Sequence, residues 1–144
     1  MSNPTGDKPA IRPCRLDEAA LLLDLWQQAR ATVSRTDTVA DIEQALAHSH
    51  AHVLVAEVAG RLVGSVIGSF DGWRGNIHRL MVHPDYRRQG IAQALVSEIE
   101  RLLAGQGARR IGTLVEKEHS WAVGFWQAAG YNLNTHLVRF IRNL

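Results

Sequence analysis

The sequence contains a single cysteine, Cys14, among its 144 residues. An internal disulfide is therefore excluded, and the composition suits a reducing compartment, so we expect a cytoplasmic protein. No helper pattern surrounds Cys14, and we interpret it as a strand residue rather than a nucleophile. No apolar run approaches the about 20 residues of a membrane-spanning helix, and the N-terminus lacks the apolar region of a signal peptide. We expect residues 1–9 to be a disordered leader and no membrane partner.

Excess charge of one sign is also missing. The 16 Lys and Arg residues nearly balance the 14 Asp and Glu residues, which leaves a formal net charge of +2. A nucleic-acid-binding protein normally concentrates basic residues in a patch, whereas the only tight basic pairs here are Arg87-Arg88 and Arg109-Arg110. We therefore expect no nucleic-acid partner. His48, His50 and His52 alternate near a strand start, but no carboxylate or cysteine joins them at ligand spacing, so we predict no metal site.

What the chain does have is enough apolar sequence for a core. Hydrophobic residues make up 46% of it, and its length suits one domain, which we place at residues 10–144. Hydrophobic periodicity predicts strands over residues 10–15, 51–58, 61–70, 75–82, 110–115, 131–133 and 137–141, and helices over residues 18–30, 39–48, 91–104 and 120–129. This order indicates an α/β or α+β fold with a mixed sheet of about six to seven strands and four helices.

Helix starts and helix faces carry their own signals. Asp17 is a candidate N-cap for the first helix, and the segment from Thr38 to Asp41 resembles a capping box with Asp in place of Glu. Apolar residues recur at helical spacing, which predicts the buried face of each helix. These residues are Leu22, Leu25, Trp26 and Ala29 in the first helix, Ile42, Ala45 and Leu46 in the second, and Ile91, Leu95, Ile99 and Leu102 in the third.

The segment Val82-His83-Pro84-Asp85-Tyr86-Arg87-Arg88-Gln89-Gly90-Ile91-Ala92 joins a predicted strand to a predicted helix. A helix start leaves unpaired N–H groups and the positive end of the helix dipole. Gly90 would let a phosphate approach the main chain without meeting a Cβ, and Arg87 and Arg88 add fixed positive charge. The residues alone fit either an anion site or an ordinary basic loop that caps a helix.

Arg87-x-x-Gly90-x-Ala92 matches the acetyl-CoA signature of the GNAT N-acetyltransferases, an Arg or Gln, then Gly, then Gly or Ala at this spacing. The preceding segment, residues 77–84, resembles the family's splayed central strand. Residues 124–131 resemble its last helix, which ends in Gly and an aromatic residue. Residues 63–75 are similar to a bacterial branch sometimes called YpeA. The resemblance implies the GNAT fold, with a mixed, mostly antiparallel central sheet and a splayed central strand pair.

The same resemblance implies that acetyl-CoA is the cosubstrate, that no metal takes part, and that an amine of a small molecule or protein is the acceptor. The pyrophosphate would lie on the turn and the pantetheine arm along the central strand, where the N–H of Met81 or Val82 could polarise the thioester carbonyl. A homodimer is compatible with the family. The cofactor-binding residues that it implies are Leu80, Met81, Val82, Arg87, Arg88, Gln89, Gly90, Ile91, Ala92, His119 and Trp126.

For the general base we favour His78, acting directly or through a water, because an imidazole titrates near neutral pH. The alternative is that His78 is a surface histidine on a strand without a catalytic role. Glu116 is the second candidate base. The chain departs from the family where Trp126 replaces the usual tyrosine acid and His119 replaces an asparagine. Tyr131 is a weak substitute acid, and solvent can protonate the thiolate.

The departures leave a second function open, a catalytically weak acyl-CoA-binding module that senses or regulates. Acceptor pockets in the family form from the first two helices and the last hairpin, here residues 26–37 and 132–139. Within the first segment, Arg30, Arg35 and Asp37 are candidates to face the acceptor, although solvated helix residues would show the same pattern. The acceptor itself is not predicted by the sequence.

Overall fold

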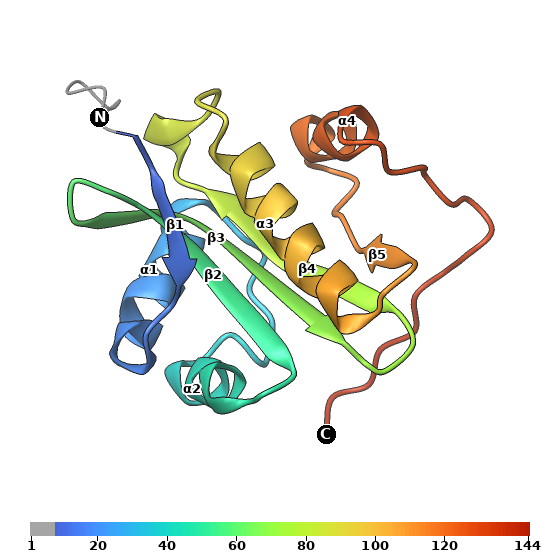
Figure 1. Ribbon diagram of the computed structural model, residues 1–144, viewed down its shortest axis with the longest axis horizontal. Coiled ribbons are helices and arrows are strands. Elements are labelled where there is room, and N and C mark those ends of the chain that lie inside the picture. The colour runs from blue at the N-terminus through green and yellow to red at the C-terminus, as the bar shows by residue number, and fades with distance from the viewer. Residues whose placement is uncertain (1–7) are drawn as a thin grey trace. The chain divides into compact units, whose positions relative to one another are not determined.

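The computed structural model describes residues 8–144, so the expected leader falls outside the described chain except for its last two residues. The chain divides into two compact units, one ending at Thr113 and the other spanning Leu114–Leu144. The first unit contains, in order, β1 (Ala10–Pro13), the 3₁₀ turn η1 (Leu16–Glu18), α1 (Ala19–Gln28), α2 (Val39–Ala47), β2 (Ala51–Val58), β3 (Arg61–Phe70), β4 (Gly75–Val82), the 3₁₀ turn η2 (Pro84–Tyr86), α3 (Ile91–Gln106) and β5 (Ile111–Thr113), and the second contains α4 (Ser120–Ala128) (Figure 1).

The five strands form one sheet in the order β1-β2-β3-β4-β5. Neighbours from β1 to β4 are antiparallel, and β4 and β5 are parallel. This confirms the mixed, mostly antiparallel sheet, with fewer strands than the six to seven expected. The missing ones are residues 131–133 and 137–141, which carry no strand in the described chain. Their apolar pattern reports propensity, but a strand also needs a neighbour to pair with.

The two faces of the sheet are covered by different helices. Side chains alternate along a strand, so Gly64 and Gly68 of β3 face one way while Ser65 faces the other. A Cβ at Gly64 would lie 2.9 Å from Ile91 of α3, and one at Gly68 would overlap Ile99, so these glycines let α3 lie close to the sheet. The opposite face packs against α1 and α2 through a core cluster formed by Ala19, Leu22, Leu25, Trp26, Ile42, Val53, Val55 and Leu62.

Most of the predicted helix features are confirmed. Thr38 caps α2, accepting a hydrogen bond from Asp41 N–H at 3.1 Å. The predicted face of α1 is buried, and in α3 Ile91, Leu95 and Ile99 are buried as expected. Two expectations were wrong. Asp17 does not cap α1, because the chain enters that helix through η1. Leu103, one helical turn after Ile99, is fully buried, whereas Leu102 is only half-buried.

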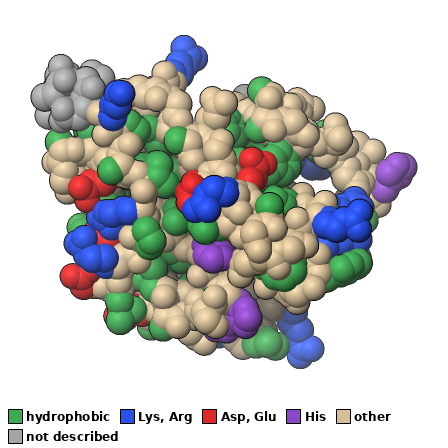
Figure 2. All heavy atoms as spheres, in the orientation of Figure 1, with side chains coloured by type: hydrophobic (Ala, Val, Ile, Leu, Met, Phe, Trp, Pro, Cys, Tyr) green, Lys and Arg blue, Asp and Glu red, His purple; other side chains and the backbone are tan. Residues whose placement is uncertain are grey.

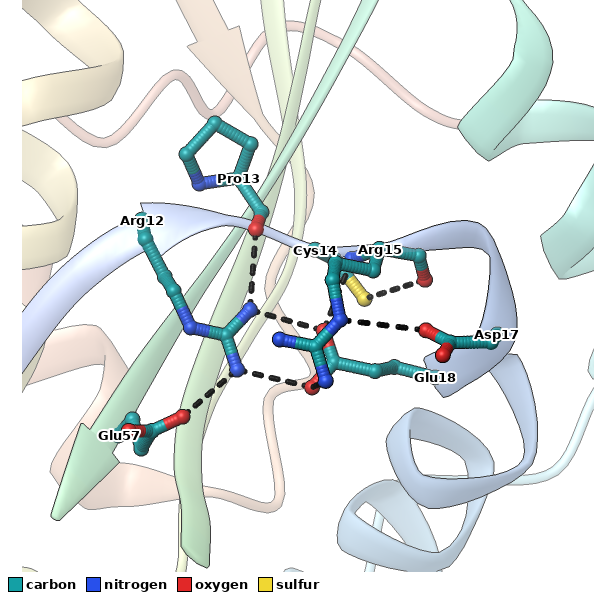
Figure 3. A network of polar contacts seen from close by, with 7 residues as sticks. All are labelled: Arg12, Pro13, Cys14, Arg15, Asp17, Glu18 and Glu57. Atoms are coloured by element: carbon teal, nitrogen blue, oxygen red, sulfur yellow. Dashed lines mark hydrogen bonds and ion pairs between the residues drawn. The ribbon is translucent and has the colours of Figure 1, made fainter. Parts of the chain in front are cut away.

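A network of charges ties β1 and η1 to β2 (Figure 3). The guanidinium of Arg12 donates to both carboxylate oxygens of Glu18, each at 2.8 Å, and to Glu57 at 2.7 Å. Glu18 also accepts from Arg15 N–H at 2.8 Å, and its side chain is only 4% exposed. The hydrogen bonds from Arg12 lower the pKa of Glu18 to about 2. Burial and then the Glu18 charge raise the pKa of the neighbouring Cys14 thiol to about 11, which agrees with an unreactive cysteine. Cys14 directly follows β1, however, so its assignment to a strand was wrong.

The network predicts acid-sensitive folding. Because the pKa of Glu18 falls from 4.5 to about 2 on folding, its stabilisation is complete above pH 4.5 and is lost as the pH drops toward 2. We expect Glu18→Gln to lower the free energy of unfolding at pH 7 by about 2–3 kcal/mol and to flatten its pH dependence in that window. Urea unfolding at several pH values measures both.

Glu98→Gln is the matched control, since Glu98 pairs with Arg101 on the solvent side of α3 and exposed pairs contribute little. Equal losses in the two variants, or an unchanged acid slope in Glu18→Gln, would contradict the assignment of acid sensitivity to the Arg12–Glu18 pair.

Positive, negative and apolar side chains are intermingled on the side of the molecule drawn in Figure 2, as the small net charge implies. Across residues 8–144, none of the helices combines the length and the hydropathy needed to cross a bilayer.

Candidate active site

The central feature of the site is a bulge in β4. Ser65 of β3 pairs with Met81, and Ile67 pairs with His78, so Arg79 and Leu80 together lie opposite a single β3 residue. Arg79 adopts a left-handed backbone conformation with φ of 54°. A bulge of this kind bends the strand and redirects its groups, a device common beside active sites. The sequence resemblance implied an irregular strand here, but nothing in the local pattern indicated which residues form the bulge.

β4 and β5 separate just before the bulge. Their parallel pairing spans Gly75–Ile77 of β4 against all three residues of β5. At the point of separation the hydroxyl of Thr113 donates to Ile77 O at 3.0 Å. This confirms the expected splayed pair, and among residues 8–144 no strand pairs with the edge of Leu80, Met81 and Val82 on the β5 side. Such an edge can accept an extended, amide-bearing ligand as if it were another strand.

His78 lies on β4 immediately before the bulge and is exposed. Directly opposite residues share a face of the sheet, so His78 is on the same face as Ile67, which packs against the α1–α2 cluster. Met81 lies on this face too, paired with Ser65. The structure thus brings the favoured base and the proposed pantetheine strand onto the side of the sheet that α1 and α2 cover.

The turn between β4 and α3 has the geometry of an anion site. Arg88 and Gly90 both adopt left-handed conformations, with φ of 61° and 79°. Arg87, Arg88, Gln89 and Gly90 are all exposed, and a Cβ at Gly90 would meet no protein atom within 4 Å. The first helical bond runs from Ala94 N–H to Gly90 O at 3.0 Å. The N–H groups of the preceding residues in this first turn, including Ile91 and Ala92, therefore lack helical acceptors.

The base of this turn is anchored by His83, a residue that the sequence analysis passed over. Asp85 N–H donates to its Nδ1 at 3.1 Å, and the Arg61 guanidinium lies 3.0 Å from its Nε2. Burial, followed by the charges of Arg61 and Arg87, lowers the pKa of His83 and keeps the ring neutral. Tyr86 is also buried and meets the ring edge-on at 5.8 Å. Tyr86 therefore anchors the loop.

The remaining predicted site residues belong to the second unit. His119 Nε2 lies 3.3 Å from a carboxylate oxygen of Glu116, so these two predicted residues contact each other. Trp126 is buried, and its ring meets that of Tyr131 edge-on at 4.7 Å between centroids. Tyr131 N–H also donates to Trp126 O at 2.9 Å, closing the end of α4. This packing gives Tyr131 a structural role as the aromatic residue that follows Gly130.

A groove of about 430 Å³ lies elsewhere, between the β3–β4 turn and the C-terminal end of α3. Its lining residues are Gly72, Trp73, Arg74, Gly107, Arg109 and Arg110. The 16 residues of α3 separate it from Gly90, which corresponds to roughly 24 Å along the helix axis. None of the predicted site residues lines this groove, so it is separate from the candidate active site.

Comparison with known proteins identifies the family. The sequence model of the acetyltransferase (GNAT) family matches residues 19–131. An acetyltransferase of Pectobacterium atrosepticum is 38% identical over 121 residues, which cover 84% of this chain and 86% of the relative. An acetyltransferase of Sodalis glossinidius is 37% identical over 123 residues, covering 85% and 87% of the two chains.

Solved structures share the fold at low sequence identity. The aminoglycoside N-acetyltransferase AAC(6')-Iy in complex with CoA superposes with a TM-score of 0.79 at 19% identity, covering 98% of this chain and 99% of that one. The PaiA N-acetyltransferase of Thermoplasma acidophilum in complex with coenzyme A gives 0.80 at 15% identity, covering 88% and 91%. With the family match extending over most of the chain, these findings establish that the protein belongs to the GNAT acetyltransferase family.

Proposed function

We propose that this protein transfers the acetyl group of acetyl-CoA to a primary amine of a small molecule or protein, by direct attack in a ternary complex. The observation that carries the proposal is the unpaired edge of β4 after its bulge, which leads straight into the exposed Arg87–Gly90 turn and the start of α3. One continuous segment thus offers main-chain groups to an amide-bearing arm and N–H groups to a pyrophosphate.

In this proposal the pyrophosphate binds the turn formed by Arg87, Arg88, Gln89, Gly90, Ile91 and Ala92. The pantetheine arm follows Leu80, Met81 and Val82. His119 and Trp126 are the other cofactor-binding residues that the sequence resemblance implies. The neutral His83 holds the base of the turn without adding a mobile charge beside the phosphates.

The main-chain direction favours Val82 over Met81 as the donor to the thioester oxygen. His83 N–H donates to Val63 O of β3 at 2.8 Å. Because N–H groups alternate in direction along an antiparallel strand, the N–H of Val82 is directed away from β3, toward the open edge. A fixed donor aimed at the developing oxyanion lowers the barrier to acyl transfer.

The chemical step removes two protons from the acceptor nitrogen and releases one thiolate. The acceptor ammonium loses its first proton to His78, directly or through a water, and Glu116 is the alternative base. The free amine attacks the carbonyl carbon, its nitrogen gives a second proton to solvent, the C–S bond breaks, and the amide and coenzyme A thiolate form. Solvent can protonate the thiolate, whose pKa is low enough for it to leave unaided. Tyr131 remains a weak candidate acid, since it packs against Trp126.

The alternative function is an acyl-CoA-binding module with weak or no turnover, which the tryptophan in place of the family's tyrosine keeps open. Calorimetry with CoA and acetyl-CoA, beside a coupled thiol-release assay over an amine library, separates the two. Aminoglycosides belong in that library because structural relatives such as AAC(6')-Iy and AAC(6')-IG are aminoglycoside acetyltransferases. Acetyl-CoA binding with no turnover on any amine would favour the binding module, and absence of binding would overturn both proposals.

We also propose, from the family resemblance, a cytoplasmic protein that can form a homodimer. Light scattering on the purified chain, with and without acetyl-CoA, measures the oligomeric state directly.

A further inference from the structure

The bulge in β4 requires support from outside the strand. Arg79 has a left-handed backbone, φ 54°, a conformation that costs energy for any residue with a Cβ. Such a conformation persists only where the surroundings hold it. The contacts that hold Arg79 come from two directions, one through its carbonyl oxygen and one through its guanidinium.

The carbonyl is held by a buried chain of hydrogen bonds that starts on α1. Trp26 Nε1 donates to Ser65 Oγ at 3.0 Å, and Ser65 Oγ donates to Arg79 O at 3.1 Å. Ser65 is completely buried and Trp26 is 4% exposed. The hydroxyl therefore accepts one bond and donates another, and it fixes the orientation of the peptide that precedes Leu80.

The guanidinium of Arg79 reaches the loop between α1 and α2, residues 29–38. It donates to Thr32 O at 3.1 Å and forms an ion pair with Asp37, and it lies over the Trp26 ring at 5.2 Å. Asp37 in turn accepts from Ser34 N–H at 2.7 Å. The Arg79 and Asp37 side chains are only 19% and 10% exposed. One residue of the bulge therefore organises both ends of this loop.

We propose that the β4 bulge makes two separate positioning contacts: Ser65 positions the acetyl-binding main chain, and the Arg79 guanidinium positions the acceptor-binding α1–α2 loop. The inference rests on the proposed function, in which β4 carries the thioester, and on the family resemblance, which places residues 26–37 in the acceptor pocket. Ser65, Trp26 and Arg79 are then positioning residues. Substitutions at the two contacts should affect different kinetic constants. Disturbing the main chain alters the chemical step, whereas releasing the loop alters acceptor binding.

Arg79→Gly tests the contact between the guanidinium and the α1–α2 loop, because glycine keeps the left-handed backbone without strain and removes only the side chain. We expect the KM for the amine to rise at least tenfold, with kcat and the Kd of acetyl-CoA changing less than threefold. Asp37→Asn should raise the same KM from the other side of the ion pair, so the test does not depend on one variant.

Ser65→Ala tests the hydrogen bond from Ser65 to the main chain of the bulge. We expect kcat to fall roughly 10- to 100-fold, because small displacements of a reacting group are costly, with the acceptor KM changing less than threefold. Ser69→Ala is the matched control. Ser69 lies on the same strand but pairs with Asn76, outside the bulge, so kcat should stay within about threefold of the native value.

Hydrogen exchange on the full-length variants gives a readout that needs no acceptor. Arg79→Gly should speed amide exchange in residues 29–38 and leave residues 80–82 unchanged, and Ser65→Ala should do the reverse. Unchanged exchange of the loop in both Arg79→Gly and Asp37→Asn, or equal changes of both segments in every variant, would overturn the assignment of two separate positioning contacts. If the native protein acetylates no amine, the proposed function fails, while the exchange pattern still tests these two contacts.

Discussion

Replacing His78 with alanine should lower kcat/KM for an amine acceptor by roughly 10²–10⁴-fold, the usual scale of general-base catalysis. His78 is exposed on β4, one residue before the bulge, and belongs to the sheet face on which Met81 also lies. An imidazole base loses activity as it is protonated, so the native kcat/KM should fall on the acidic side of neutrality. In His78→Ala that acidic limb should disappear and leave only the ionisation of the acceptor.

The control is His52→Ala, which removes a strand histidine that contacts Gln106 and belongs to no proposed site. It should keep both the rate and the shape of the profile. If His78→Ala keeps the rate and the acidic limb as well, the base is Glu116 or an ordered water, and Glu116→Gln then becomes the variant to measure. Binding of acetyl-CoA should be unaffected in every one of these proteins.

Gly90→Asp should weaken binding of acetyl-CoA by well over tenfold. The position is exposed and a Cβ there would meet no protein atom within 4 Å. The side chain therefore clashes with nothing in the free protein, although the left-handed backbone costs it some strain, and it occupies the volume that a phosphate needs. A carboxylate about 4 Å from a phosphate charge costs about 4 kcal/mol at an effective dielectric constant of 20, before screening by salt. Calorimetry with CoA measures the loss, which should shrink as the salt concentration rises.

Gly90→Asn separates the effect of charge from that of shape. Asparagine is nearly the same size as aspartate and has a similar tolerance for the left-handed conformation at φ 79°. Both residues are good N-caps, so α3 should stay intact. We expect the asparagine variant to bind CoA more weakly than the native protein but clearly more tightly than the aspartate variant. Native CoA affinity in a folded Gly90→Asp protein would show that the pyrophosphate binds elsewhere.

Local patterns were sufficient for most of the first unit. The predicted strand segments became β2, β3 and β4 with the expected bounds, and Thr38 caps α2 as its spacing indicated. The same is true of the β4–α3 turn, because a strand end, Gly90 and a helix start are adjacent in the chain. Interactions between residues a few positions apart set these features, so the sequence displays them directly.

The second unit shows the limit of such patterns. Residues 137–141 have the composition of a strand, yet Val138 and Phe140 are 80% and 92% exposed and no strand forms there among the described residues. Apolar alternation indicates which side chains could share a face, but the partner strand has to come from elsewhere. Strand propensity without a partner is therefore a weak predictor.

The sequence alone determined the order of the elements in the first unit, the position of the β4–α3 turn and the family. Only the tertiary structure decided which residues form the bulge, that Ser65 and Asp37 hold it, and that Arg12 neutralises Glu18. Asp37 is 42 residues from Arg79 in the chain, and Trp26 is 39 residues from Ser65. A hydrogen bond at that separation leaves no periodic trace, because it depends on how α1 packs on the sheet and on a register shift of one residue, and both are set by the core as a whole.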